Sequence, residues 1–285
     1  MDLKVLMNEK LIKELKERTS KYLNKIEEKI KGELENYSSS NFYKPLKYAL
    51  EGGKRMRPLI LLLSTEAVGG KIEDSLDAAF AVELLHTESV IHDDIIDNEE
   101  FRRDKLSFHT KYGYNLSILT ADFVLGLILN ILSRYDDKRI MGEISSAAIR
   151  MCEGELLEIK FASKNAEVSW DKYIEIVRNK TASLFEVSST LGAIIGKGSP
   201  HHVHLLGRYG LNLGIAYQLK DDLLDFKKKD KVVSLLKVDG DKEELLRKET
   251  LNYSLQAKKE LEALKDSKAK ELLSILADFA IKRAL

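Results

Sequence analysis

The sequence predicts an all-α protein. Apolar residues recur at spacings of three and four along most of the 285 residues, which is the pattern of helices with one buried face. The prolines are Pro45, Pro58 and Pro200, and they leave long stretches in which a helix can continue. No segment alternates apolar and polar residues over a convincing strand length. We therefore expect one all-α domain that spans residues 1–285.

Composition narrows the class of protein further. Hydrophobic residues make up 44% of the chain and charged residues 32%, an ordinary soluble mixture. The 46 basic and 46 acidic residues cancel, which argues against nucleic acid as a partner. Cys152 is the single cysteine, which excludes an intrachain disulfide and suits a reducing compartment. We find neither an apolar run of about 20 residues nor a signal-peptide pattern, so we expect a cytoplasmic protein without a transmembrane segment.

The first expected helix covers residues 3–36, so that residues 1–40 form an N-terminal amphipathic helix and loop of the same domain. Its apolar stripe would pack on the bundle or on a second subunit, and it consists of Leu11, Ile12, Leu15, Tyr22, Leu23, Ile26 and Ile30. Residues 38–41 break the pattern. A second helix runs to Leu50, and Gly52 and Gly53 end it.

A cluster of cations follows. Lys54, Arg55 and Arg57 stand between Gly53 and Pro58. Cations beside a flexible backbone suit a polyanionic phosphate, and the alternative is a solvated basic turn. Pro58 suits the first turn of the next helix.

The helix expected over residues 78–92 ends in an acidic motif, Asp93-Asp94-Ile95-Ile96-Asp97. Asp93 and Asp97 are four residues apart and share a face, whereas Asp94 is turned about 100° away. Like charges at this spacing oppose each other by roughly 0.2–0.5 kcal/mol in water, and by more when buried. A hard divalent cation such as Mg²⁺ would compensate them, since it prefers oxygen ligands. The alternative is an exposed acidic helix end.

Further polar side chains stand near this motif. His86 lies about two turns before Asp93 and faces roughly the same way, so it either binds substrate or is a satisfied core histidine. Arg102 and Arg103 follow in an expected loop at the same end. They would neutralise a metal-bound diphosphate, or in the simpler alternative pair with the carboxylates.

Three further helices are expected, over residues 116–135, 140–161 and 170–195. Asp122 lies in the first, and we expect it to make a hydrogen-bonded helix contact. Lys180 and Thr181 interrupt the third, and taken alone this pair would be placed on the surface. The next helix begins with histidines that lack the i, i+4 geometry of paired zinc ligands, His201, His202 and His204.

A second acidic motif stands more than a hundred residues after the first, Asp221-Asp222-Leu223-Leu224-Asp225. Asp221 and Asp225 share a helical face, and Gln218 lies one turn earlier on the same side. Two such motifs on apolar helices suggest two walls of one metal-lined cavity, because helix bundles build sites from carboxylates on facing helices. Two charged amphipathic helices complete the chain.

Taken in order, these motifs resemble those of the trans-type isoprenyl (polyprenyl) diphosphate synthases, the family of the farnesyl and geranylgeranyl diphosphate synthases. The resemblance runs from about residue 43 to the C-terminus. It implies a bundle of antiparallel helices around a central cavity, usually assembled as a homodimer. It also implies a Mg²⁺-dependent prenyltransferase, in which an allylic diphosphate ionises, isopentenyl diphosphate attacks the carbocation, and a proton is removed.

The resemblance also implies residue roles. About three Mg²⁺ ions would stabilise the departing diphosphate. Their principal ligands would be Asp93, Asp97 and Asp221, supported by Asp94, Asp222 and Asp225. The isopentenyl diphosphate pocket is matched by Lys54, Arg57, His86 and Arg103. The allylic side is matched by Arg102, Lys180, Thr181 and Gln218, of which the last three are the expected catalytic residues.

The chain departs from the family pattern after Phe226. The family usually continues with a loop rich in Gly and Lys, whereas here the lysine-rich residues 227–231 lead almost directly into an apolar segment. Either the lysines form a lid over the allylic diphosphate or the site closes poorly. An alternative function, from a different class, is a catalytically weak regulatory or structural partner of another synthase subunit, but the retention of both aspartate motifs and the basic residues favours an active synthase. A class I terpene cyclase is disfavoured because such enzymes usually replace the second aspartate motif.

Glu88 stands five residues before Asp93, and Ser89 four before. In the family these positions face the elongation cavity, where a bulky aromatic residue stops the chain early. A carboxylate is an unusual lining for a hydrocarbon tunnel, because burying it without a partner is costly. If Glu88 points inward, we expect products of about fifteen to twenty carbons. The alternative is an ion pair at a helix or subunit contact.

Overall fold

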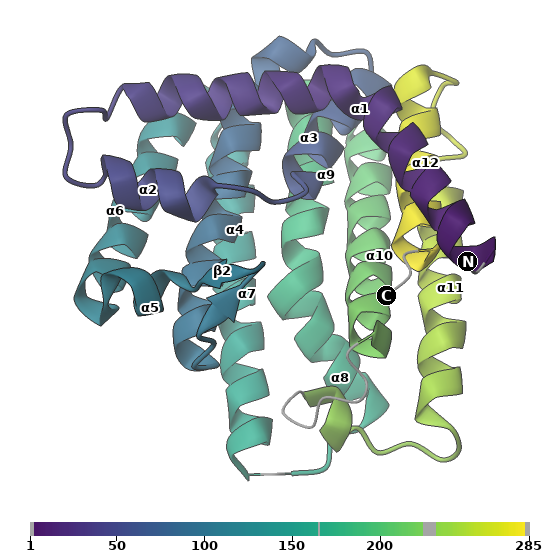
Figure 1. Cartoon of the computed structure of the whole chain (residues 1–285). Coiled ribbons are helices and arrows are strands. Elements are labelled where there is room, and N and C mark those ends of the chain that lie inside the picture. Colours follow the sequence, from purple (N-terminus) through teal and green to yellow (C-terminus); the bar gives the residue numbers. More distant parts are fainter. Residues whose placement is uncertain (1–2, 165, 225–231, 283–285) are drawn as a thin grey trace.

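The computed structural model describes residues 3–164, 166–224 and 232–282, and nearly all regular structure in them is helical (Figure 1). The all-α prediction is confirmed. The helices are α1 (Leu3–Glu35), α2 (Tyr43–Leu50), α3 (Met56–Ala67), η1 (Ile72–Ser75), α4 (Leu76–Ile96), α5 (Phe108–Tyr112), α6 (Tyr114–Leu132), α7 (Lys138–Lys164), α8 (Trp170–Val177), η2 (Arg178–Ala182), α9 (Ser183–Ile195), α10 (Pro200–Leu224), η3 (Val232–Leu235), α11 (Lys242–Glu260) and α12 (Lys268–Lys282).

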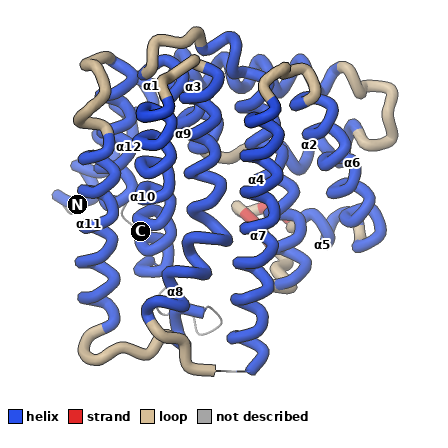
Figure 2. Tube along the Cα trace, turned by 180° about the vertical axis from the view of Figure 1, so that it is seen from behind, coloured by secondary structure: helices blue, strands red, loops and turns tan. Residues whose placement is uncertain are grey.

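The long helices stand side by side, and α1 crosses one end of them (Figures 1 and 2). The α1 stripe is buried within the chain at Tyr22, Ile26 and Ile30, because α1 packs on α3, α4 and α12. Toward the other end, α10 finishes beside α8 (Figure 1), and the charges of Asp93 on α4 and Asp221 on α10 both act on Arg57. Both acidic motifs are therefore brought to the same end of the bundle.

Two clusters of buried apolar side chains hold the helices together. The main core is built largely by α3, α4 and α9, and α3 is apolar on every side, since residues 59–63 are at most 2% exposed. A smaller core joins α8, the end of α10, η3 and α11, and it includes Tyr173, Leu219, Val233 and Leu246. The smaller core fixes the position of α8 beneath the second acidic motif.

Arg102 and Arg103 lie in a short hairpin where a loop was expected. Strands β1 (Phe101–Arg102) and β2 (Lys105–Leu106) pair antiparallel. Arg103 and Asp104 form the turn, with φ of 52° and 61°. Two successive left-handed residues match the twist of the flanking strands, and this geometry usually recruits Asn-Gly. The hairpin therefore holds Arg103 in a conformation that is uncommon for a side chain of its size.

Among the described residues, α6 is a helix long and apolar enough, by length and composition alone, to cross a membrane. No apolar run of about 20 residues was expected from the sequence, and α6 departs from that expectation. Within the molecule 44% of the apolar window is buried, and α6 packs mainly on α4. Core helices of soluble proteins pass the same test, so this feature is weak evidence for a membrane span.

Candidate functional site

The first acidic motif occupies the end of α4. Asp93 is partly buried and Asp97 exposed, whereas Asp94 is only 2% exposed. Burial is the main cause that raises the pKa of Asp93; Asp97 raises it further, and Lys180 lowers it. Burial also raises the pKa of Asp97, again against Lys180. Asp93 and Asp97 therefore share an environment with one lysine.

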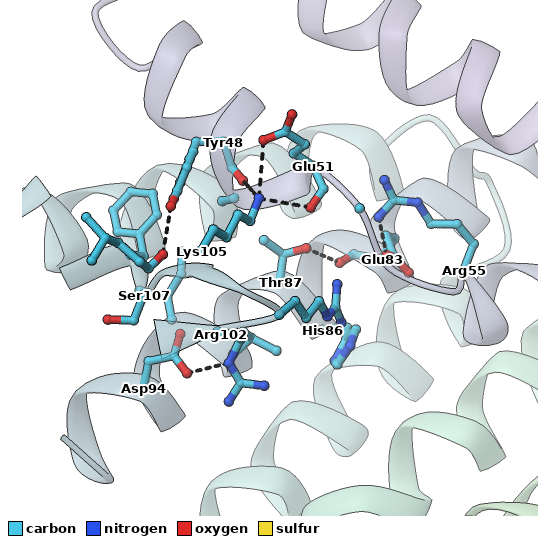
Figure 3. Close-up of a pocket in the computed structure, with 17 residues that line it drawn as sticks. Tyr48, Glu51, Arg55, Glu83, His86, Thr87, Asp94, Arg102, Lys105 and Ser107 are labelled. Carbon is cyan, nitrogen blue, oxygen red and sulfur yellow. Dashed lines mark hydrogen bonds and ion pairs between the residues drawn. The ribbon is translucent and has the colours of Figure 1, made fainter. Parts of the chain in front are cut away.

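Asp94 points to the hairpin, where it forms an ion pair with Arg102 (Figure 3). Burial raises the pKa of Asp94, and the charge of Arg102 opposes this effect. Arg102 therefore makes the charge pair that one of its two interpretations requires, and its role toward a diphosphate stays a prediction. Asp94 thus anchors Arg102 beside the motif.

Lys105 ties the hairpin to α2. Its ammonium donates to the backbone oxygens of Tyr48 and Glu51, each at 3.2 Å, and lies 3.3 Å from the Glu51 carboxylate (Figure 3). The Tyr48 hydroxyl in turn donates to the backbone oxygen of Leu106 at 2.7 Å. A cation at the C-terminal end of a helix satisfies its last carbonyls. The contact therefore fixes the hairpin that carries both arginines.

A pocket opens between α2, α4 and the hairpin (Figure 3). His86, Arg102 and Arg103 line it. Arg103 lies against Gly53, where an added Cβ would come within 2.9 Å of its Nη1. Burial, followed by the charges of Arg57 and Arg103, lowers the pKa of His86 well below its usual value. His86 is therefore a neutral ring surrounded by cations, a setting that an anionic ligand would relieve.

The basic segment divides into a structural and an exposed part. Arg55 is 6% exposed and adopts a left-handed φ of 50°. It donates to Glu83 at 2.6 Å, to Glu27 at 2.7 Å and to the backbone oxygen of Leu50 at 2.5 Å. These bonds clamp the loop, while Lys54 beside it is exposed.

Arg57 reaches the space between the two acidic motifs. Its guanidinium carbon lies 4.6 Å from the centroid of the Phe185 ring. Burial lowers the pKa of Arg57, while the charges of Tyr217, Asp221 and Asp93 raise it. Its buried Nε has no hydrogen-bond partner among the described residues. A partly buried cation with a buried, unused donor and carboxylates on two sides is suited to bind a polyanion.

Lys180 lies in η2, a π-helix rather than a regular helical turn. Its ammonium lies 2.5 Å from Glu155 and 2.6 Å from Glu158, both on α7. The backbones meet at Gly154, where a Cβ would come within 2.4 Å of the Lys180 nitrogen. Burial is the largest single influence and lowers the pKa of Lys180, but the charges of Glu158, Asp93 and Glu155 together outweigh it, so the pKa is raised. Lys180 is thus partly buried, not on the surface.

Sequence reasoning missed Glu155 and Glu158. Both belong to an amphipathic segment rich in glutamate, so composition does not single them out. The available signal is their i, i+3 spacing directly after Gly154, which puts two carboxylates on one helical face at a close backbone contact.

Thr181 and Gln218 meet across η2 and α10. The Thr181 hydroxyl donates to Gln218 Oε1 at 2.9 Å, and Gln218 Nε2 donates to Asp222 Oδ1 at 3.0 Å. Asp222 is 4% exposed and also accepts a hydrogen bond from Tyr173. Asp222 therefore points into the protein, away from the face that carries Asp221.

The second acidic motif ends α10. Asp221 acts on Arg57 electrostatically, as Asp93 does from α4, whereas Asp225 lies outside the described residues. Carboxylate oxygens are the donors that Mg²⁺ prefers, and the raised pKa values of Asp93 and Asp97 indicate groups that a cation would stabilise. Within the described part of the chain, no three potential ligands converge closely enough to hold an ion by themselves. The residues fit Mg²⁺ if substrate oxygens complete its coordination.

Comparison with known proteins agrees with this geometry. The polyprenyl synthetase family matches residues 39–272. A short chain isoprenyl diphosphate synthase of Methanothermobacter thermautotrophicus is 29% identical over 92% of this chain and 97% of its own. A geranylgeranyl diphosphate synthase of Saccharolobus solfataricus is 36% identical over 72% of this chain and 65% of its own.

Solved structures give the same result. The crystal structure of a geranylgeranyl pyrophosphate synthetase from Pyrococcus horikoshii superposes with a TM-score of 0.86 at 29% identity, covering 96% of this chain and 99% of that one. The corresponding enzyme from Geoglobus acetivorans gives a TM-score of 0.84 at 27% identity, covering 94% and 99%. The motifs, the fold and these matches agree, and the chain belongs to the polyprenyl synthetase family.

Proposed function

We propose that this protein is a short-chain trans-prenyltransferase, which joins isopentenyl diphosphate to an allylic diphosphate. The observation that carries the proposal is the position of Arg57, a partly buried cation whose buried Nε has no hydrogen-bond partner among the described residues and whose charge interacts with both Asp93 and Asp221. An unpaired guanidinium donor shielded from water is costly, and it suits a polyanion bound between two acidic walls. The names of the relatives support the same substrate class.

The chain's own residues would divide the work between two substrates. His86 and Arg103, which line the pocket beneath the hairpin, would hold the diphosphate of isopentenyl diphosphate. Arg57, whose charge acts on His86, would contribute from beside that pocket. Lys180 and Arg102 would take the charge that develops on the allylic diphosphate as its carbon–oxygen bond breaks. Thr181 and Gln218 would face the cation with weakly nucleophilic oxygens until the double bond of isopentenyl diphosphate attacks. Loss of a proton then restores a double bond.

Magnesium would be held by Asp93, Asp97 and Asp221, and it would supply Lewis-acid stabilisation of the departing diphosphate. Asp94 is assigned to Arg102 instead, because its buried carboxylate already pairs with that side chain. We also propose that the enzyme works in the cytoplasm as a homodimer and that residues 1–285 act as one domain.

The direct test is incubation of the purified protein with Mg²⁺, isopentenyl diphosphate and an allylic primer, followed by sizing of the products. We expect EDTA to abolish product formation and Mg²⁺ to restore it.

Asp93→Ala and Asp221→Ala should each lower turnover by at least about a hundredfold while keeping the helical circular dichroism spectrum, because each 1.4 kcal/mol of lost transition-state stabilisation is about tenfold in rate. Near-normal turnover in both variants would exclude the metal role. A wild-type protein that lacks turnover but stimulates another synthase subunit would favour the regulatory alternative.

A further inference from the structure

Tyr173 and Asp222 form a buried pair directly behind the proposed allylic site. Tyr173 lies on α8 in the smaller core and is 0% exposed, and Asp222 lies on α10 and is 4% exposed. The Tyr173 hydroxyl donates to Asp222 Oδ2. Burial, followed by the charge of Asp222, raises the pKa of Tyr173 well above its usual value. The tyrosine therefore stays a hydrogen-bond donor at any working pH.

This pair determines how the Gln218 amide is oriented. The NH₂ group of Gln218 donates a hydrogen bond to Asp222 Oδ1, which lies 3.0 Å away. The Gln218 oxygen must then point the other way, to the Thr181 hydroxyl at 2.9 Å. Because the Thr181 proton is used in that bond, the lone pairs of its oxygen remain for the cavity. The hydrogen bonds thus converge on Asp222, which accepts from Tyr173 on one side and from Gln218, itself the acceptor of the Thr181 proton, on the other.

We propose that Tyr173 and Asp222 are positioning residues that set the polarity of the wall facing the allylic cation. They act through Gln218, whose amide oxygen, with the Thr181 oxygen, presents the negative end of a dipole to a developing positive charge. This inference rests on the proposed function and gives Asp222 a role other than metal ligand. It also explains why a hydroxyl stands at a fully buried position where phenylalanine would fill the same space.

The test compares two tyrosines that are equally buried. Tyr209 is also 0% exposed, and its hydroxyl donates to the backbone oxygen of Leu273 at 2.8 Å, outside the site. Tyr173→Phe and Tyr209→Phe each remove one buried hydroxyl and keep the ring, so both should lower the melting temperature by a few degrees. We expect Tyr173→Phe alone to lower kcat, about tenfold, with KM for isopentenyl diphosphate unchanged. It should also raise the fraction of allylic diphosphate that is hydrolysed instead of condensed.

A double-mutant cycle tests whether Tyr173 acts through Gln218. In a Gln218→Ala background, Tyr173→Phe should cause no further loss of kcat, because the group that it orients is gone. Multiplicative losses in the double mutant, or equal kcat in Tyr173→Phe and Tyr209→Phe, would overturn the inference. A wild-type protein without condensation activity would instead overturn the proposed function on which it rests.

Asp222→Asn separates positioning from metal binding. If Asp222 orients Gln218, the variant should lose kcat while the Mg²⁺ concentration for half-maximal activity stays the same. The Mg²⁺-induced shift in melting temperature, measured with inorganic diphosphate present, should also match that of the wild type. A raised Mg²⁺ requirement with normal kcat at saturating metal would overturn the positioning role.

Discussion

Glu88 is a half-buried carboxylate on α4 without a compensating cation. Burial, followed by the charge of Asp122 on α6, raises the pKa of Glu88 to about 7. Among the described residues it forms no ion pair, so the expected alternative of a pair within the subunit is not present there. Cys152 on α7 also senses its charge. Glu88 on α4 therefore lies near α6 and α7, and its protonation state changes near neutral pH.

We predict that this charge limits product length. Glu88→Ala should lengthen the products, because an ionised carboxylate disfavours an adjacent hydrocarbon tail. Since the pKa is about 7, lowering the pH from about 8 to about 6 should protonate Glu88 and lengthen wild-type products. The distribution from Glu88→Ala should not change over that range. Chromatographic sizing is the measurement, with Glu153→Ala, an exposed residue on α7, as control. An unchanged product distribution in an active Glu88→Ala variant would contradict the prediction that Glu88 limits product length.

Substitutions of Arg57 and of Lys180 should change the kinetic constants of different substrates. Arg57→Ala should raise KM for isopentenyl diphosphate about ten- to a hundredfold, which corresponds to losing one charged hydrogen bond. Lys180→Ala should mainly lower kcat and raise KM for the allylic substrate. Initial rates with each substrate varied in turn measure both effects. If both variants affected both substrates equally, the assignment of the two diphosphate sites would be wrong.

At the scale of elements, the hairpin depends on its attachment to α2. Lys105→Ala removes the donor to the Tyr48 and Glu51 carbonyls and should let the hairpin move. We expect KM for both diphosphates to rise about three- to tenfold with a smaller change in kcat, because two arginines lose their fixed positions. Lys111→Ala is the matched control: Lys111 lies 3.6 Å from the Tyr48 ring centroid but makes none of these backbone bonds. Equal KM values in the two variants would contradict the prediction that Lys105 holds the hairpin in position against α2.

The acidic motifs could be predicted from sequence because their chemistry depends on local spacing. Positions i and i+4 share a helical face in any context, so the shared environment of Asp93 and Asp97 and the different direction of Asp94 follow from periodicity alone. The same rule predicted the helix that begins near His201.

Other features depend on contacts between distant segments and could not be predicted. The π-helix at Lys180 fits against Gly154 on α7 and Gly214 on α10, where a Cβ would come within 2.6 Å of the neighbouring backbone. Helical propensity over residues 170–195 predicts only one continuous helix. The inward direction of Asp222 likewise requires Tyr173, which is 49 residues away in sequence.

On the scale of the whole molecule, α6 and α7 expose apolar stripes. Ile118, Leu125 and Leu129 on α6 are 44–57% exposed, and Ile149 on α7 is 64% exposed. Exposed apolar surface of this kind marks an interface, which supports the proposed homodimer.

We predict that Ile118→Glu combined with Leu125→Glu gives a monomer, because two charges would be buried unpaired between subunits. Sedimentation velocity measures the change. Leu251→Glu with Leu255→Glu on α11, where the leucines are 48% and 55% exposed, serves as the control and should leave the assembly intact. A wild-type protein that sediments as a monomer would contradict the dimer.

The π-helix has a consequence for how the molecule is divided into two cores. A π turn holds more residues than the 3.6 of an α-helix, so the helical faces before and after it are out of phase. Before η2, Tyr173, Ile174 and Val177 enter the smaller core, and after it Leu184 and Phe185 enter the main core. Deleting a single residue from 178–182 would restore a regular helix and rotate one of these faces by about 100°. One extra residue thus lets one continuous helical segment pack in both cores. Lys180 and Thr181, the proposed catalytic residues, lie where the phase changes.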